Sequence, residues 1–307
     1  MKNKKAKNTN SNVVKTVGVP SDVVMSAEQI DAELDELAAV PPKRRVWEID
    51  FLRGLMILFV VWDHFMYDVY CVGKNYNTDL FIWLNELAKS YYSGVLRRVT
   101  HDAFVTMFVF TSGVSCSFSQ SNGKRAIKMT VFACLLTAST YALSAIIGEN
   151  LTMNFNVIHT IALSVLLWTA IEFCRGKCVR NWQKNIFGVV MTAVIVASIV
   201  VGSCAKAQPW TSESKVWFFL VPHIGADFNR FTGGDYSPFL PNFGWFLVGA
   251  FLGKIAYKER KTLFPSVNEK WVCPITFCGR YSLWVYVGSQ IVMFGLIYLF
   301  SVVLGLL

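Results

Sequence analysis

Ionisable residues lie at helical spacing inside an apolar stretch, RRVWEIDFLRGLMILFVVWDHFMYDV, at residues 44–69. At about 100° per residue, Asp50, Arg53, His64 and Asp68 fall within an arc of about 60° on one helix face. His64 lies about 16 Å beyond Arg53 along that face, at a rise of about 1.5 Å per residue. Ionisable side chains within a membrane helix face a partner or a polar cavity, so this stripe predicts one wall of a buried cavity.

His64 is the residue of this stripe with the widest chemical capacity. An imidazole titrates near neutral pH, so it can accept a proton from a hydroxyl or an amine, or carry an acyl group briefly. Asp68 follows at i+4, the spacing at which a carboxylate orients a histidine on the same helix. Asp63 points about 100° away from His64, which favours a structural role. A simpler interpretation makes Asp50 and Arg53 interfacial anchors and His64 an interhelical hydrogen-bond donor.

Other apolar stretches supply polar partners for His64. Asp102 opens the next stretch, and His159 lies near the outer end of a later one. Arg280 begins the last stretch at its cytosolic edge, and Gln290 lies about 15 Å deeper, at a depth comparable to that of His64. The sequence shows no Ser-His-Asp motif, Gly-rich phosphate loop or metal-ligand cluster. These residues therefore favour general-base or nucleophilic chemistry.

The composition indicates that the helices carrying these residues lie in a membrane. Of the 307 residues, 54% are hydrophobic and 16% are charged, and the mean hydropathy is +0.42. The apolar residues form blocks of about 18–25 residues, the length that crosses a bilayer as a helix. The sequence therefore predicts an all-α, polytopic transmembrane helix bundle, integral to the cell membrane and surrounded by the lipid bilayer. Seven spans are expected, with eight as the alternative, at about 49–70, 102–121, 126–147, 154–174, 184–204, 239–257 and 281–305.

Lysine and arginine predict the orientation of the chain. They gather in short loops beside the apolar blocks, at 124–128, 175–184 and 254–270, whereas the loop at 148–153 has none. This bias predicts a cytosolic N-terminus. It also accounts for the net charge of +9, so nucleic acid is not an expected partner. Residues 1–45 are polar, and we expect a poorly ordered cytosolic tail there.

Eight cysteines are scattered along the chain. The pairs Cys174/Cys178 and Cys273/Cys278 lack the two-residue gap and the neighbouring histidines that are typical of structural zinc sites. We expect these cysteines to be small packing residues, and we expect no bound metal.

The ordered motifs of the chain resemble those of a known enzyme family. The first stretch matches a pattern of a basic residue, then I-D-x-x-R-G, an apolar run, and a polar residue eleven positions after the arginine, which is His64 here. Further matches are DAFVTMFVFTSG, NVIHTIALS, DYSPFLPNFGWFLVGAFLGK and GRYSLWVY, in the expected order from residue 44 to about 295. Together they resemble the heparan-α-glucosaminide N-acetyltransferase catalytic family, especially its bacterial branch.

The resemblance implies that residues 46–307 form a transmembrane acyltransferase domain. Its reaction would move an acetyl group from cytosolic acetyl-CoA to a sugar amine or hydroxyl of a cell-envelope glycan. His64, with Asp68 beside it, would be the general base or a transient acetyl carrier, and arginines suit the phosphates of CoA. The implied cofactor-binding residues are Asp50, Arg53 and Arg280, and the implied substrate-binding residues are Asp102, His159 and Gln290.

Two positions depart from the family pattern. The lysosomal branch has a histidine in the loop before the second span, and alignment on Asp102 puts Tyr92 there in this chain. His101 lies nearby but out of register. Bacterial relatives often read YLxHQ in the last span, whereas this chain reads YVGSQ, with Ser289 at the histidine position.

A proton-coupled transporter or flippase is the competing class, because a stripe of histidine and aspartate also forms a proton relay. The sequence shows neither an internal repeat nor paired helices broken by Gly and Pro, and this favours the enzyme. A catalytically inactive scaffold is a third interpretation, to which Ser289 points. The sequence leaves the oligomeric state open, a homo-oligomer included.

Overall fold

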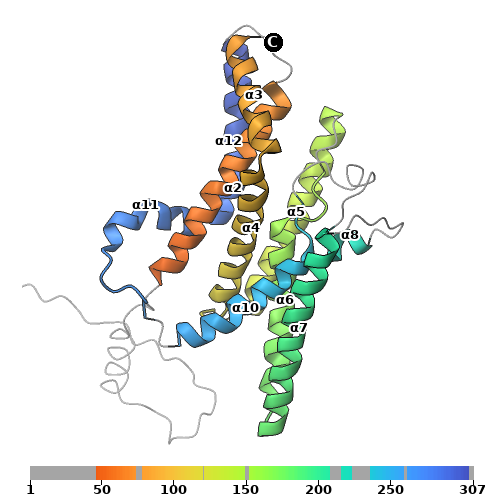
Figure 1. Cartoon of the computed structure of the whole chain (residues 1–307), viewed down its shortest axis with the longest axis vertical. Helices are drawn as coiled ribbons and strands as arrows, with labels where there is room; N and C mark the ends of the chain where they lie inside the picture. Colours follow the sequence, from red (N-terminus) through yellow and green to blue (C-terminus); the bar gives the residue numbers. More distant parts are fainter. Residues whose placement is uncertain are drawn as a thin grey trace, which may run out of the picture. The chain divides into compact units, whose positions relative to one another are not determined.

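The computed structural model describes residues 46–73, 78–119, 121–148, 152–207, 216–222, 236–258 and 261–303. The tail expected at 1–45 lies outside these residues. Ten helices and no strand occur in the described part of the chain, which confirms the all-α prediction (Figure 1). The helices are α2 (Trp47–Gly73), α3 (Asp79–Ser93), α4 (Val95–Cys116), α5 (Asn122–Ile147), α6 (Val157–Gly176), α7 (Asn181–Ala207), α8 (Val216–Leu220), α10 (Phe239–Ala256), α11 (Glu269–Arg280) and α12 (Ser282–Val303).

Four helices of the described residues are long and apolar enough to cross a membrane. In α5 and α7, only 6% and 11% of the apolar window is buried within the protein, so these helices present apolar surface that lipid would cover. In α6 and α10 the buried share is 44% and 50%, which places both helices in the interior of the bundle. The four segments are Asn122–Ile146, Val157–Gly176, Asn181–Ala205 and Phe239–Ala256. The count of seven spans and the cytosolic N-terminus stay predictions.

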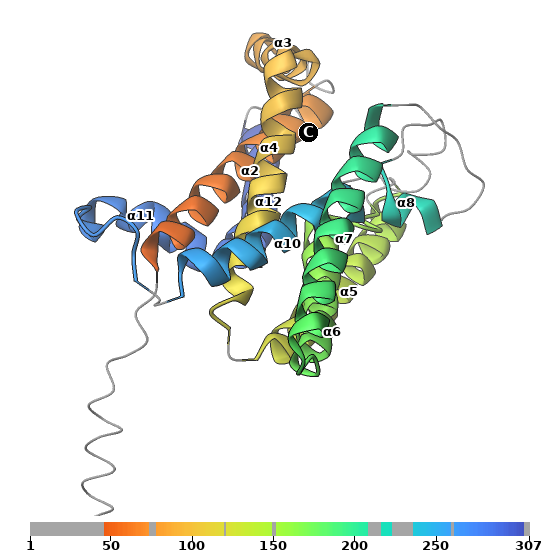
Figure 2. The same ribbon diagram turned by 60° about the horizontal axis from the view of Figure 1, so that its bottom comes forward.

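α10 lies between two groups of helices. In Figures 1 and 2, α5, α6 and α7 lie on one side of it, and α2, α3, α4 and α12 lie on the other. α10 packs against α4 and α7, while α2 packs against α3, α4, α11 and α12. Trp168, Phe246 and Leu247 are fully buried in the core that α6 and α10 share.

Glycines let α4 and α10 approach each other closely. A Cβ atom at Gly113 would lie 2.1 Å from the carbonyl oxygen of Phe246, and one at Gly249 would lie 2.2 Å from that of Phe110. Small residues at such positions allow close van der Waals packing between membrane helices. This contact fixes the position of α4, which supplies residues at both ends of the candidate site.

α2 and α11 meet through a second pair of glycines. A Cβ atom at Gly54 would lie 1.8 Å from a backbone oxygen of α11, and one at Gly279 would lie 1.7 Å from a backbone oxygen of α2. Each glycine adjoins an arginine that is implied to bind the cofactor: Gly54 follows Arg53, and Gly279 precedes Arg280. The contact between the two backbones therefore determines where both arginines lie.

Alanine at Gly54 should destabilise the protein, because the added methyl group overlaps the backbone of α11. We expect a loss of about 1–3 kcal/mol, typical of overpacking, although alanine raises helix propensity by about 1 kcal/mol. Gly188→Ala in α7 is the matched control, since a Cβ atom there meets nothing within 4 Å. This control should be neutral or stabilising. Thermal unfolding of the purified protein in detergent measures both effects, and equal melting temperatures would contradict the close contact.

Glu48 ties the first turn of α2 to the segment that precedes α11. Its Oε1 accepts a hydrogen bond from the backbone N–H of Leu263 at 2.7 Å, and its Oε2 accepts one from Thr262 Oγ1 at 3.0 Å. The Glu48 side chain is buried. Buried charges are stable in a fold when hydrogen bonds satisfy them, so this contact holds α11 against α2 together with the glycines.

Candidate active site

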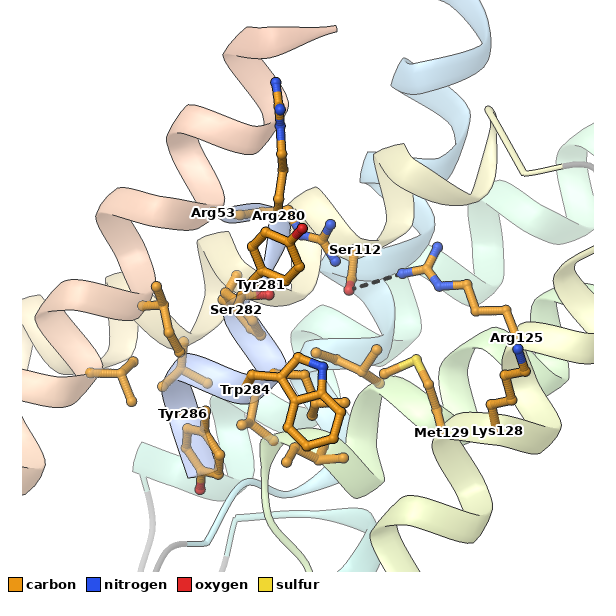
Figure 3. Close-up of a pocket in the computed structure, with 18 of the residues that line it drawn as sticks. Arg53, Ser112, Arg125, Lys128, Met129, Arg280, Tyr281, Ser282, Trp284 and Tyr286 are labelled. Carbon is orange, nitrogen blue, oxygen red and sulfur yellow. Dashed lines mark hydrogen bonds between the residues drawn. The ribbon is translucent and has the colours of Figure 1, made fainter. Parts of the chain in front are cut away.

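A cavity of about 660 Å³ lies between α2, α4, α5, α6 and the start of α12. Its volume is within the range of sites for small molecules and cofactors. Figure 3 shows Arg53 and Arg280 on one side of this cavity and Arg125 and Lys128 on the other. The lining residues divide into a cationic end, an apolar passage and a histidine end.

The cationic end consists of Arg53, Lys124, Arg125, Lys128 and Arg280. Arg53 lies on α2, and Arg280 is the last residue of α11. The other three cations lie in the first two turns of α5. No carboxylate lines the cavity at this end in the described part of the chain. The end therefore suits a ligand with several negative charges. The sequence predicts the two arginines here, whereas membrane orientation is already a sufficient explanation of the α5 cations at the level of the sequence.

Hydrogen bonds orient two of these cations. Arg280 Nε donates to Asp50 Oδ2 at 3.3 Å. Two of the three implied cofactor-binding residues, one from α2 and one from α11, are therefore in contact. On α5, Arg125 Nη2 donates to Ser112 Oγ at 3.5 Å, the contact drawn as a dashed line in Figure 3. Arg125 Nη1 also lies 3.5 Å from Cys116 Sγ. These contacts tie α5 to the C-terminal half of α4.

An apolar passage leads away from the cationic end. Its walls include Ile57 of α2, Val105 and Phe108 of α4, Met129 of α5 and Ile161 of α6. Such walls keep water away and lower the local dielectric constant, which strengthens electrostatic interactions with any group bound there. The passage can therefore hold an apolar, unbranched part of a ligand.

The histidine end brings together His64 of α2 and His101 of α4. The His64 ring packs edge-on against Tyr286 of α12, with 5.5 Å between ring centroids and 61° between planes. His64 lies eleven residues beyond Arg53 on α2, and His101 lies eleven residues before Ser112 on α4. At 1.5 Å per residue, the two ends of the cavity are about 16 Å apart along both helices.

Asp63 lines the same end and is held in a network of charged and aromatic side chains. Its Oδ1 accepts a hydrogen bond from Arg97 Nε, and its Oδ2 accepts one from Arg97 Nη2, both at 2.8 Å. Tyr91 Oη donates to Oδ1 at 3.1 Å, and His101 Nε2 lies 3.8 Å from Oδ2. Burial, and after it the charge of Asp63, raises the pKa of Tyr91 to about 12, so this phenol stays protonated. The carboxylate is thus fixed in one orientation.

Asp68 and Gln290 do not appear among the described residues that line the cavity. Asp68 Oδ2 and Gln290 Nε2 are buried, and neither atom has a hydrogen-bond partner within the described residues. α12 begins at Ser282, and Tyr286 is the residue of α12 whose ring meets His64. The catalytic role of Asp68 and the substrate-binding role of Gln290 stay predictions.

His159 belongs to the capping box that begins α6. Asn156 Oδ1 accepts hydrogen bonds from two backbone N–H groups of α6, and the Asn156 N–H donates to His159 Nδ1 at 3.4 Å. His159 Nε2 lies 2.9 Å from Thr137 Oγ1 of α5. This side chain therefore links α5 to α6, outside the described lining residues. Asp102 is exposed, and its Oδ1 lies 3.9 Å from His101 Nδ1.

A family model described as "Heparan-alpha-glucosaminide N-acetyltransferase, catalytic" matches residues 45–291, most of the chain. The chain belongs to this family. The protein is accordingly a membrane acetyltransferase by family. No curated protein and no solved structure matches the chain.

Tyr92 and Ser289 occupy the two positions at which the sequence departs from the pattern expected for the heparan-alpha-glucosaminide N-acetyltransferase catalytic family. Both side chains make contacts within the helix bundle. The Arg97 guanidinium lies over the Tyr92 ring, with 4.2 Å between Arg97 Cζ and the ring centroid. Tyr92 Oη donates a hydrogen bond to the backbone oxygen of Asp63 at 3.4 Å. Ser289 Oγ donates to the backbone oxygen of Tyr286 at 2.9 Å. In the described residues, no three His, Cys, Asp or Glu side chains gather as metal ligands.

Proposed function

We propose that the protein moves an acetyl group from cytosolic acetyl-CoA to an amine or hydroxyl of a sugar in a cell-envelope glycan. Residues 46–307 would form the catalytic domain in the cell membrane, with the N-terminus in the cytoplasm. The observation that carries the proposal is one cavity that joins five cations to two histidines through an apolar passage. Membership of the family supports acetyl transfer as the reaction.

The cationic end fits the phosphates of CoA. Arginine binds phosphate oxygens through its planar fork, and lysine binds them as a point charge. Arg125 and Lys128 of α5 lie across the cavity from Arg53 and Arg280 (Figure 3), so phosphates bound between them meet positive charge from two sides. The pantetheine arm then lies along the apolar passage, and its thioester reaches His64, about 16 Å from Arg53.

His64 is the proposed catalytic residue, and two routes fit its position. In direct transfer, the imidazole takes the acceptor proton while the acceptor oxygen or nitrogen attacks the thioester carbonyl, and the C–S bond breaks to release CoA. In the two-step route, an imidazole nitrogen attacks the thioester carbonyl carbon, and the C–S bond breaks to release CoA as the thiolate. The acceptor then attacks the acetyl-imidazole, the C–N bond breaks to return the imidazole, and the acceptor proton passes to the thiolate. The edge-on contact with Tyr286 restrains the ring for either route.

Two measurements test this proposal. Titration of the purified chain with acetyl-CoA should give saturable binding that free CoA competes away. Mass spectrometry of envelope glycans, from cells with and without the protein, should reveal an acetyl mark that depends on the protein. Absence of both binding and mark would refute the proposal. Proton-coupled solute flux into proteoliposomes without either result would instead fit the transporter class.

A further inference from the structure

His101 is a second imidazole at the end of the cavity that holds His64, and it comes from a different helix. It lies on α4, about two turns from the start of that helix, and lines the cavity with a side chain that is 31% exposed. Its two ring nitrogens face carboxylates: Nε2 lies 3.8 Å from Asp63 Oδ2, and Nδ1 lies 3.9 Å from Asp102 Oδ1. The ring is thus accessible from the cavity, and a carboxylate lies near each of its two nitrogens.

Asp63 is itself fixed in orientation beside this imidazole, with its Oδ2 3.8 Å from His101 Nε2. Its side chain is buried, and two hydrogen bonds from Arg97 and one from Tyr91 fix the plane of the carboxylate. Arg97 is itself held by its contact with the Tyr92 ring. A carboxylate fixed in this way presents Oδ2 to His101 in one orientation, as an orienting residue does for a catalytic histidine.

We propose that His101 is a catalytic base on the acceptor side of the acetyl transfer, and that Asp63, fixed by Arg97, is its positioning residue. This inference rests on the proposed function. In this division His101, in place of His64, takes the acceptor proton, while His64 lies beside the donor thioester in direct transfer or carries the acetyl group in the two-step route. The division follows from position, because α4 begins at the predicted outer face and His101 lies close to that end.

The step balances without any further reactant. The His101 imidazole takes the proton of the acceptor hydroxyl or amine as the acceptor oxygen or nitrogen bonds to the acetyl carbonyl carbon. The bond from that carbon to sulfur, or to the His64 nitrogen in the two-step route, breaks, and its electron pair stays with the leaving atom. The proton on His101 then passes to the CoA thiolate, or to the His64 nitrogen, through the cavity. Asp63 and Asp102 stabilise the imidazolium in the interval.

The test compares His101→Ala, His101→Gln and Asp63→Asn in membranes that receive acetyl-CoA labelled in its acetyl group. Label in the envelope glycan fraction measures transfer, and titration of each purified variant measures acetyl-CoA binding. We expect both His101 variants to lose transfer about 10²- to 10⁴-fold, the usual share of a general base, with the Kd for acetyl-CoA changed less than about twofold. Added imidazole should restore part of the activity of His101→Ala.

Asp63→Asn should lower kcat about tenfold or more with little change in KM. It should also add nothing to the loss in a variant that already carries His101→Ala, because a positioning residue acts only through the residue it positions. Arg98→Ala, an exposed neighbour of Arg97 on α4, is the matched control and should transfer at the wild-type rate.

The outcomes separate two failures. Transfer by folded His101→Gln at the wild-type rate, or full additivity of the two substitutions, would overturn the role of His101 while leaving the proposed function intact. If His101→Ala fails to fold, His101→Gln decides, because it keeps most of the volume and polarity. A wild-type chain that neither binds acetyl-CoA nor labels the glycan fraction would overturn the proposed function, and the inference with it.

Discussion

His64→Ala should lower acetyl transfer about 10³-fold or more while leaving the amount of folded protein unchanged. A general base alone contributes about 10² to 10⁴ in rate, and a transient carrier cannot be replaced by water in an apolar passage. The side chain lines the cavity beside Tyr286, so its removal enlarges an existing space. Incorporation of labelled acetyl groups into envelope glycans measures the loss.

Leu58→Ala is the matched control for this substitution. Leu58 lies on the same helix, and 41% of its surface is exposed. It should transfer at close to the wild-type rate, and the His64 variant should bind acetyl-CoA with a Kd within about twofold of wild type. Wild-type transfer by His64→Ala would remove this residue from the mechanism. An acetyl group found on His64 after acetyl-CoA alone is added would select the two-step route.

Local helical geometry explains why part of the site follows from the sequence. The period of an α-helix puts Arg53 and His64 on one face whatever the neighbouring helices do, and both residues line the cavity. Asp50 follows the same rule and reaches Arg280. The helical pattern thus predicts that Arg53 and His64 point into the cavity. Asp68 of the same face is not among the described lining residues, whereas Asp63, off that face, is. The pattern does not predict which residues of other helices meet them.

The residues that sequence reasoning missed depend on the register between helices. Asp63 lies off the His64 stripe because it faces α3 and α4, where Arg97 lies 34 residues along the chain. The sequence contains one signal: an acid inside the first apolar stretch and a base a few residues before the next stretch, which tend to pair when buried. Their register is determined by tertiary packing, including the glycine contact at Gly113, and no periodicity of a single helix reveals it.

The last apolar stretch also shows what the sequence does not predict, here a break between two helices. Continuous helix from Arg280 onward would give Gln290 a depth that matches His64. The structure instead ends α11 at Arg280 and starts α12 at Ser282, with Tyr281 between them at φ −106° and ψ 23°. Tyr286 consequently meets His64. Because of this break, the depth of Gln290 does not follow from a count of residues from Arg280, and it stays a prediction.

Removal of the three α5 cations together, as Lys124→Ala, Arg125→Ala and Lys128→Ala, should raise the Kd for acetyl-CoA about 100-fold. Hydrogen bonds to charged groups contribute about 1.5–3 kcal/mol each. Lys124 and Lys128 are exposed, so solvent screening reduces the contribution of these two side chains. A 100-fold change corresponds to about 2.8 kcal/mol, at about 1.4 kcal/mol per tenfold. Titration of the purified variant at low salt measures it.

The matched control removes three other cations, Lys177, Arg180 and Lys184, which are exposed around the α6–α7 connection and do not line the cavity. Their loss should leave the Kd within about twofold of wild type. Acetyl-dephospho-CoA, which lacks one phosphate, should lose less affinity than acetyl-CoA on removal of the α5 cations, and added salt should weaken binding to the wild type more than to this variant. Equal losses in the two triple variants would mean that only general positive charge matters. An unchanged Kd in the α5 variant would exclude the three α5 cations from donor binding and would leave Arg53 and Arg280 as the residues to test next.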